Sequence, residues 1–135
     1  MSTAFFSHPD CRRHDMGAGH PECPARLDAI EDHLLATGLD IALTRFDVPL
    51  ADHDDLVLAH SEGYLLELGE FMQQAAANGE HRALDPDTTV CPATWRAALR
   101  AAGAAVAATD AVIDGQAENA FCAIRPPGHH ATRSQ

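Results

Sequence analysis

The spacing of apolar residues along this chain predicts three helices. In each of them apolar side chains recur every three or four residues, and the helices cover residues 24–38, 61–79 and 92–115. Prolines open the first and third helices, Ser61 is a candidate N-cap for the second, and a glycine closes each of the three. The third helix has the clearest pattern. Its predicted buried stripe consists of Trp95, Leu99, Ala102, Val106 and Ile113.

Short apolar runs before, between and after the helices predict three strands, at residues 3–7, 41–48 and 120–124. Strands that alternate with longer helices are typical of parallel βαβ pairing, so the sequence predicts an α/β fold with a parallel sheet flanked by helices. Three strands make a thin sheet, however, and we expect one domain, residues 1–135, whose architecture is incomplete. The remaining longer segments, predicted as loops, are residues 10–22 and 80–91.

Composition narrows the class of function. The net charge is −11, from 20 acidic residues against 9 basic ones, all of which are arginine. An acidic chain without a basic run argues against direct binding to nucleic acid or to a membrane surface. The longest apolar stretch, Ala101 to Ala108, is far shorter than the ~20 residues of a membrane span, and the first residues do not resemble a signal peptide. We therefore expect a cytoplasmic protein whose four cysteines are free thiols.

Histidines follow two of the predicted strands: His8 follows the first, and His129 and His130 follow the third. In an open parallel sheet, ligands bind outside the carboxyl ends of the strands. The sequence Pro126-Pro127-Gly128 predicts a rigid, sharp turn, because proline fixes φ and glycine permits the bend. One imidazole could then act as a general base on a water molecule and its neighbour as an electrostatic or acid partner. A surface turn with two solvated histidines is the alternative.

A second polar segment, residues 20–26, has the sequence His-Pro-Glu-Cys-Pro-Ala-Arg. His20, Glu22 and Cys23 are potential metal ligands, but three ligands so close in an extended segment rarely converge on one ion. The alternative is that this segment only begins a helix, with Arg26 as a solvated charge on the first turn. The residues alone leave both interpretations open.

The tandem histidines lie in the sequence Arg-Pro-Pro-Gly-His-His-Ala, residues 125–131. This segment is similar to the tandem-histidine motif of the histone deacetylase and acetylpolyamine amidohydrolase superfamily, particularly its class II and bacterial branches. Residues 20–26 resemble the family's His-Pro-Glu-x-Pro-x-Arg segment, and residues 60–65 resemble its His-Ser-x-x-Tyr pattern. The resemblance covers essentially the whole chain. It implies the N-terminal portion of the three-layer arginase/deacetylase fold, and zinc-dependent hydrolysis of acetylated lysine or acetylpolyamine amides.

The resemblance also implies roles for five residues. His129 and His130 match two histidines that contact a zinc-bound water, and the second is usually assigned as general base and acid. Arg26 matches an arginine at the floor of the pocket, behind the catalytic centre. Asp87 lies in a segment that matches a loop lining the substrate entrance, and Gly128 belongs with these residues at the substrate pocket.

The family's zinc ligands and catalytic tyrosine have no counterpart in this sequence, so we assign no metal ligand. In the family they follow the tandem histidines, whereas the only tyrosine here, Tyr64, precedes them. Because zinc supplies the Lewis acid of this chemistry, we expect the chain alone to be inactive. Two functions stay open: the N-terminal part of a deacetylase, or a non-catalytic relic that acts as an oligomerising or partner-binding module. Unpaired apolar surface predicts a homo-oligomer, or association with a missing C-terminal half.

Overall fold

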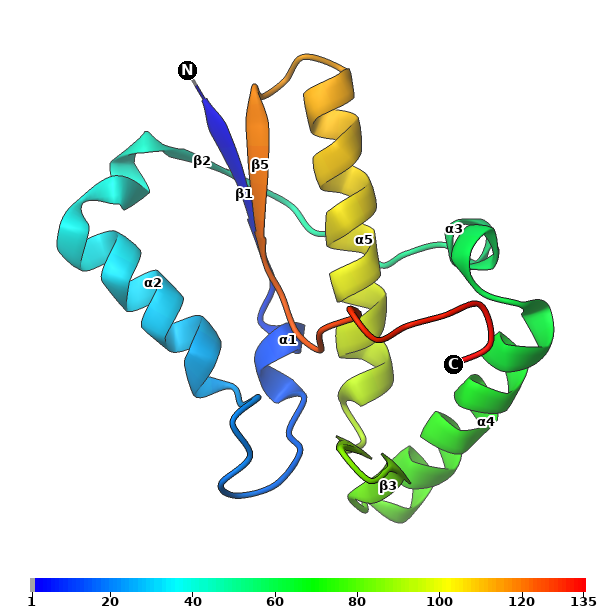
Figure 1. Cartoon of the computed structure of the whole chain (residues 1–135). Helices are drawn as coiled ribbons and strands as arrows, with labels where there is room; N and C mark the ends of the chain where they lie inside the picture. The colour runs from blue at the N-terminus through cyan, green and yellow to red at the C-terminus, as the bar shows by residue number, and fades with distance from the viewer. Residues whose placement is uncertain (1) are drawn as a thin grey trace.

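The computed structural model describes residues 2–135 and contains a three-stranded parallel sheet between helices (Figure 1). The strand order is β2 (Leu43–Phe46), β1 (Thr3–Ser7), β5 (Asn119–Ala123). Helix α2 (Ala25–Thr37) packs on one face of the sheet and helix α5 (Thr94–Ile113) on the other. The predicted α/β class and the parallel pairing are confirmed.

The two faces of β1 bury different partners, because successive side chains of a strand point to opposite faces. Phe5 packs with Leu27 of α2, whereas Ala4 and Phe6 pack with the alanines of α5. These three residues of β1 are at most 1% exposed, so the central strand is buried on both sides. All three strands run parallel, and their carboxyl ends therefore meet at one edge of the sheet.

The ends of the long helices follow local sequence signals. Helix α2 ends at Gly38, whose φ of 73° is in the left-handed region that favours glycine. Helix α4 (Glu62–Asn78) begins after Ser61, whose side-chain oxygen accepts a hydrogen bond from the backbone N–H of Tyr64. It ends at Gly79, which also has a positive φ, of 64°. These predicted helix ends are confirmed.

Several short elements were not predicted. They are helix α1 (Asp10–Arg13), helix α3 (His53–Ala59) and the antiparallel hairpin of β3 (Arg82–Asp85) and β4 (Thr88–Val90). The second strand is also shorter than predicted, since the 3-10 turn η1 (Leu39–Ala42) replaces its start. Segments this short cannot show a full hydrophobic period, and such elements form only through tertiary contacts.

The predicted buried stripe of α5 is wrong. Ile113 is 76% exposed and Val106 is 37% exposed. The residues that α5 buries are small: Thr94, Ala97, Ala101, Gly103, Ala104, Ala108 and Ala111. The chain that follows β2 crosses the helix closely, and the backbone N–H of Ala51 donates to the carbonyl of Leu99 at 3.0 Å. Only small side chains fit such an approach, so the larger apolar residues of α5 turn elsewhere.

We expect Gly103→Ala to destabilise the fold by roughly 1–3 kcal/mol, the range for overpacking a close contact. A Cβ at this position would overlap the carbonyl oxygen of Pro49 and would lie 2.9 Å from the backbone nitrogen of Ala51. Both are backbone atoms, so a helix or the crossing segment would have to shift. Gly69→Ala in α4 is the matched control, because its added methyl group would meet nothing within 4 Å. It should stabilise by about 0.5–1 kcal/mol in urea unfolding. Equal effects of the two substitutions would contradict the packing.

Two further expectations concern cysteines and membranes. All four cysteines are unpaired, as predicted, with Cys11 and Cys91 buried. Across residues 2–135, no helix has both the length and the apolar character that crossing a bilayer requires.

Candidate functional site

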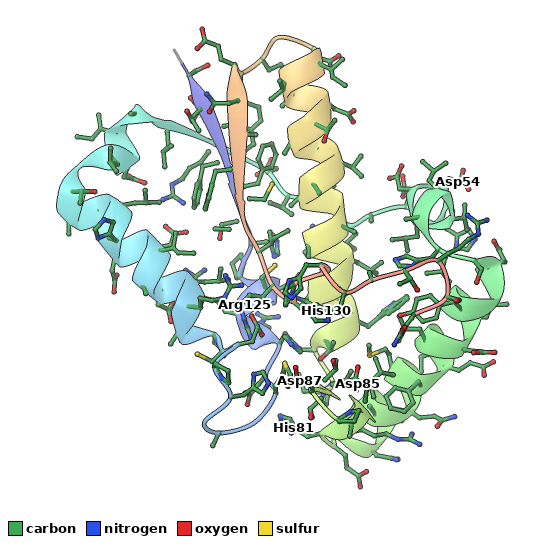
Figure 2. All side chains as sticks on the ribbon, viewed as in Figure 1. Asp54, His81, Asp85, Asp87, Arg125 and His130 are labelled. Atoms are coloured by element: carbon green, nitrogen blue, oxygen red, sulfur yellow. The ribbon has the colours of Figure 1, made fainter. Side chains whose placement is uncertain are left out.

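His129 and His130 occupy the centre of a tight turn beyond the carboxyl end of β5. Figure 2 labels His130 of this pair. The backbone N–H of Ala131 donates to the carbonyl of Gly128 at 3.0 Å and closes the turn. The two imidazole centroids lie 4.4 Å apart, with their planes inclined at 59°. Both side chains are exposed. The turn therefore presents two neighbouring imidazoles in different directions.

A cleft of about 680 Å³ opens beside this turn. Its apolar wall comes mainly from α4 and α5 and includes Leu65, Leu68, Met72, Trp95 and Leu99. Among the predicted site residues, Arg26, Gly128 and His129 line the cleft. His130 and Asp87 do not. A volume of this size is within the usual range for small-molecule sites, so the cleft is the candidate substrate site.

Asp87 lies at the tip of the β3–β4 hairpin (Figure 2), with its side chain 95% exposed. Its carboxylate is 3.8 Å from Nε2 of His20, and its backbone N–H donates to the carboxylate of Asp85 at 2.8 Å. That backbone hydrogen bond is the first cause of the lowered pKa of Asp85, and the charge of His130 contributes to it. Asp87 itself therefore contacts the segment before α2.

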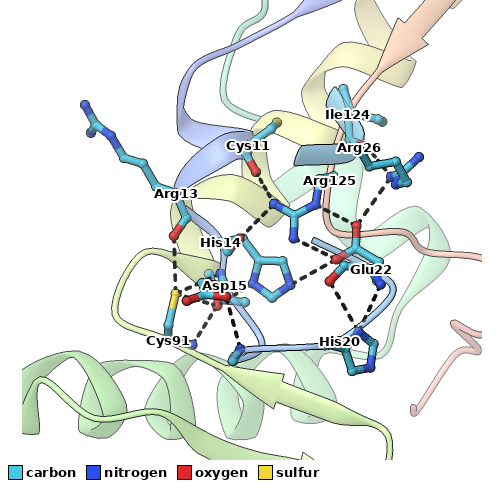
Figure 3. A network of polar contacts seen from close by, with 12 residues as sticks. Cys11, Arg13, His14, Asp15, His20, Glu22, Arg26, Cys91, Ile124 and Arg125 are labelled. Atoms are coloured by element: carbon cyan, nitrogen blue, oxygen red, sulfur yellow. Dashed lines mark hydrogen bonds and ion pairs between the residues drawn. The ribbon is translucent and has the colours of Figure 1, made fainter. Parts of the chain in front are cut away.

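Arg125, immediately before the Pro-Pro-Gly turn, is completely buried (Figure 3). Its Nε and Nη2 atoms donate to the two carboxylate oxygens of Glu22, at 2.6 and 2.8 Å. Its Nη1 atom donates to the carbonyls of Cys11 and His14, at 2.9 and 2.7 Å. A buried guanidinium requires such partners, and the two-pronged pair with a carboxylate is the strongest arrangement available to it. The pair joins the end of β5 to a residue 103 positions away in the sequence.

Glu22 also contacts Arg26, whose Nη2 lies 3.4 Å from the carboxylate and donates to the carbonyl of Ile124 at 3.3 Å. Burial alone would raise the pKa of Glu22, but the hydrogen bonds and charge of Arg125 outweigh it and hold that pKa below its ordinary value. Glu22 is therefore an anion shared by two arginines. The reading of residues 20–26 as only a helix start misses this pairing.

The zinc site implied by the family resemblance does not fit the residues present. Among residues 2–135, no three histidine, cysteine, aspartate or glutamate side chains gather where they could hold a metal ion. Glu22, one of the candidate ligands, has both carboxylate oxygens occupied by Arg125. The nitrogen Nδ1 of His20 accepts a hydrogen bond from the backbone N–H of Glu22 at 3.1 Å. Within this segment, Glu22 thus binds two arginines instead of a metal ion.

His14 lies beside the Arg125–Glu22 pair, and its side chain is 1% exposed. Its Nδ1 is 2.8 Å from Oγ1 of Thr94, while its Nε2 has no hydrogen-bond partner and lies 3.8 Å from a carboxylate oxygen of Glu22. Burial, followed by the charge of Arg125, lowers the pKa of His14 below 6.5. The residues around His14 in the sequence give no sign of these distant partners, so local patterns do not indicate its role.

We expect the free energy of unfolding to fall as the pH drops below about 6.5. The unfolded chain binds a proton at His14 near its ordinary pKa, whereas the folded chain binds it only at lower pH. The unfolded state therefore holds more protons in this window, and one such group changes stability by at most about 1.4 kcal/mol per pH unit. His14→Asn should flatten the slope. The double variant with His8→Asn added should flatten the slope further. Burial, followed by the charge of Arg100, also lowers the pKa of His8. Urea titrations at pH 7 and pH 5.5 measure this, and identical slopes in all three proteins would refute it.

Comparison with known proteins matches residues 20–135 to the histone deacetylase domain. A histone deacetylase-like amidohydrolase of Pseudomonas aeruginosa is 34% identical over 98% of this chain and 38% of its own length. Human polyamine deacetylase HDAC10 is 33% identical over 99% of this chain and 21% of its own length. The chain thus spans well under half of the relatives that it matches.

The fold is also found among solved structures. The crystal structure of the HDA15 HD domain superposes with a TM-score of 0.86 at 24% identity, covering 98% of this chain and 39% of that one. The three-stranded α/β architecture of this chain therefore matches part of that longer structure. The chain belongs to the histone deacetylase domain family.

Proposed function

We propose that this chain is the N-terminal portion of a zinc-dependent deacetylase that hydrolyses acetylated lysine or acetylpolyamine amides. The observation that carries the proposal is the pair of adjacent imidazoles, 4.4 Å apart, on a turn that borders a mostly apolar cleft. Family membership supports the reaction class, and the names of two relatives, an amidohydrolase and a polyamine deacetylase, support the two substrate classes.

Amide hydrolysis needs a proton acceptor and a proton donor at the same place. A water molecule loses a proton as it attacks the carbonyl carbon, and the leaving amine gains one as the C–N bond breaks. Imidazole can do both near neutral pH. We assign the proton transfer to His130 and an electrostatic role to His129, with Arg26 contributing positive charge to the wall of the cleft.

The zinc of this family polarises the carbonyl and activates the water. Since residues 2–135 contain no ligand set for it, its ligands have to come from outside them, and the isolated chain is expected to be inactive. Association with a C-terminal portion would supply the metal site. His129, which lines the cleft, and His130 beside it on the same turn would then face that site.

Complementation tests this function. The chain is co-expressed with the C-terminal portion of the Pseudomonas aeruginosa relative, and the purified complex is assayed for zinc content and for hydrolysis of acetylated lysine and acetylated polyamine substrates. We expect activity from the complex and none from either part alone. A complex that forms and holds zinc but hydrolyses neither substrate would refute the proposal.

A non-catalytic role is the second candidate, and the exposed apolar surface favours it. Ile41, Leu58 and Ile113 are 91%, 80% and 76% exposed, and the outer edge of β5 is unpaired with Phe121 51% exposed. Such surface suits a homo-oligomer or a partner. This candidate is preferred if the isolated chain self-associates in light scattering and the complementation assay finds no activity.

A further inference from the structure

The segment that follows the tandem histidines returns to the start of α4. In Figure 1 it runs in red from the end of β5 to the junction of α3 and α4. Nδ1 of His60 lies 2.8 Å from the carbonyl oxygen of Thr132, and the backbone N–H of Ser61 donates to the carbonyl of Arg133 at 2.7 Å. A carbonyl oxygen only accepts hydrogen bonds, so Nδ1 of His60 carries the hydrogen.

His60 and Ser61 are prepared for this contact by the helix that they precede. The Ser61 side chain caps α4 through the N–H of Tyr64, while its own backbone is extended, with φ −74° and ψ 147°. Its N–H is therefore outside the helix and available to a passing segment, as in a strand. The ring of Tyr64 lies 5.2 Å from that of His60 and limits the orientations of the imidazole.

The tandem-histidine turn thus lies between two anchors. Before it, the Arg125 side chain is held by Glu22, 103 residues away; after it, Thr132 is held by His60, 72 residues away. Both catalytic imidazoles are exposed, so the backbone on either side of the turn determines where they lie. A turn anchored at one end only could pivot, and the two rings would lose their fixed relation to the cleft.

We propose that His60 and Ser61 form a dock for the segment after the tandem histidines, which together with the Arg125–Glu22 pair holds the turn at both ends. His60 is then a positioning residue that acts through the backbone of Thr132. The effect of His60 on catalysis rests on the proposed function, whereas the dock itself consists only of contacts within this chain.

Nuclear magnetic resonance of the isotopically labelled full chain tests the dock. His60→Phe keeps a ring against Tyr64 but removes the donor, and His60→Asn restores a side-chain N–H near the position of Nδ1. In His60→Phe we expect the Ser61 amide to exchange with solvent about fivefold faster or more, and the ring signals of His129 and His130 to shift. His60→Asn should restore both. His53→Phe is the matched control, because His53 pairs with Glu62 instead of the turn.

Amide signals of β1 and β5 report whether each variant keeps the fold. If they are unchanged and His60→Phe leaves the Ser61 exchange and the histidine signals as in the wild type, the dock is overturned. An equal response in His53→Phe would also overturn it. In the complemented complex, His60→Phe should lower kcat, and His60→Asn should recover it; because His60 also lines the cleft, KM is measured for both variants. A complex that is inactive throughout refutes the proposed function and leaves the resonance result on the dock intact.

Discussion

We expect His130→Ala to lower amide hydrolysis by roughly 10²–10⁴-fold in the complemented complex, the range for loss of a general acid–base group. The proton that leaves the attacking water has to reach the departing amine, and an alanine can neither accept nor donate it. Zinc content should stay unchanged, because neither tandem histidine belongs to a metal-ligand group in this chain. The measurement is the initial rate on the better of the two substrates, with zinc determined on the same samples.

The matched comparison is His129→Ala. We expect a smaller loss, since water can partly replace an electrostatic neighbour. The comparison is informative because His129 lines the cleft and His130 does not. A larger loss for His129→Ala would transfer the proton-transfer role to His129. If the rate is unchanged in both variants, the tandem histidines have no catalytic role, and the alternative of a surface turn with two solvated histidines holds.

The second large effect concerns stability. Glu22→Ala should lower the free energy of unfolding by about 3–5 kcal/mol, because it leaves the fully buried Arg125 without its counter-ion. This is a large part of the ~5–15 kcal/mol that stabilises a typical domain. Replacing both partners, by Glu22→Leu with Arg125→Met, should recover much of the loss, since no buried charge remains. Urea unfolding followed by the fluorescence of Trp95, the only tryptophan, measures all three proteins.

Glu31→Ala is the control for this effect. Glu31 is 19% exposed, close to the 16% of Glu22, and it pairs with Arg45 at 2.8 Å. The arginines differ, since Arg45 is 47% exposed and Arg125 is 0% exposed. In the control, water can hydrate the charge of Arg45 after its partner is removed. Glu31→Ala should therefore lower the free energy of unfolding by at most about 1 kcal/mol. Similar losses for the two glutamates would show that burial of Arg125 is not what makes Glu22 important.

The Arg125–Glu22 pair also explains why residues 20–26 and 125–131 belong to one site. One segment begins a helix and the other follows the last strand, and a single carboxylate links Arg125 to Arg26. Any change at Glu22 therefore acts on the fold and on the cleft together. The dock at His60, which is half-buried and also lines the cleft, is the better place to test positioning with less effect on the fold.

Features that depend on neighbouring residues could be predicted from local sequence patterns. Gly38 and Gly79 end helices because their backbones adopt a positive φ, and Ser61 begins one because its hydroxyl reaches an N–H three residues later. The parallel α/β class followed from strands alternating with helices. The motif at 125–131 identified the family, and with it the candidate histidines, before any distance was known.

Which surfaces pack together could not be predicted from local patterns, because it depends on the complete fold. Helix α5 buries its alanines, although its larger residues formed the more conspicuous stripe, because the sheet and the crossing segment at Pro49 leave space only for small side chains. Arg125 pairs with Glu22, which is 103 residues away in the sequence. Thr132 is bound by His60, which is 72 residues away. Local sequence patterns cannot predict contacts between residues so far apart, because these contacts depend on how complete helices and strands pack.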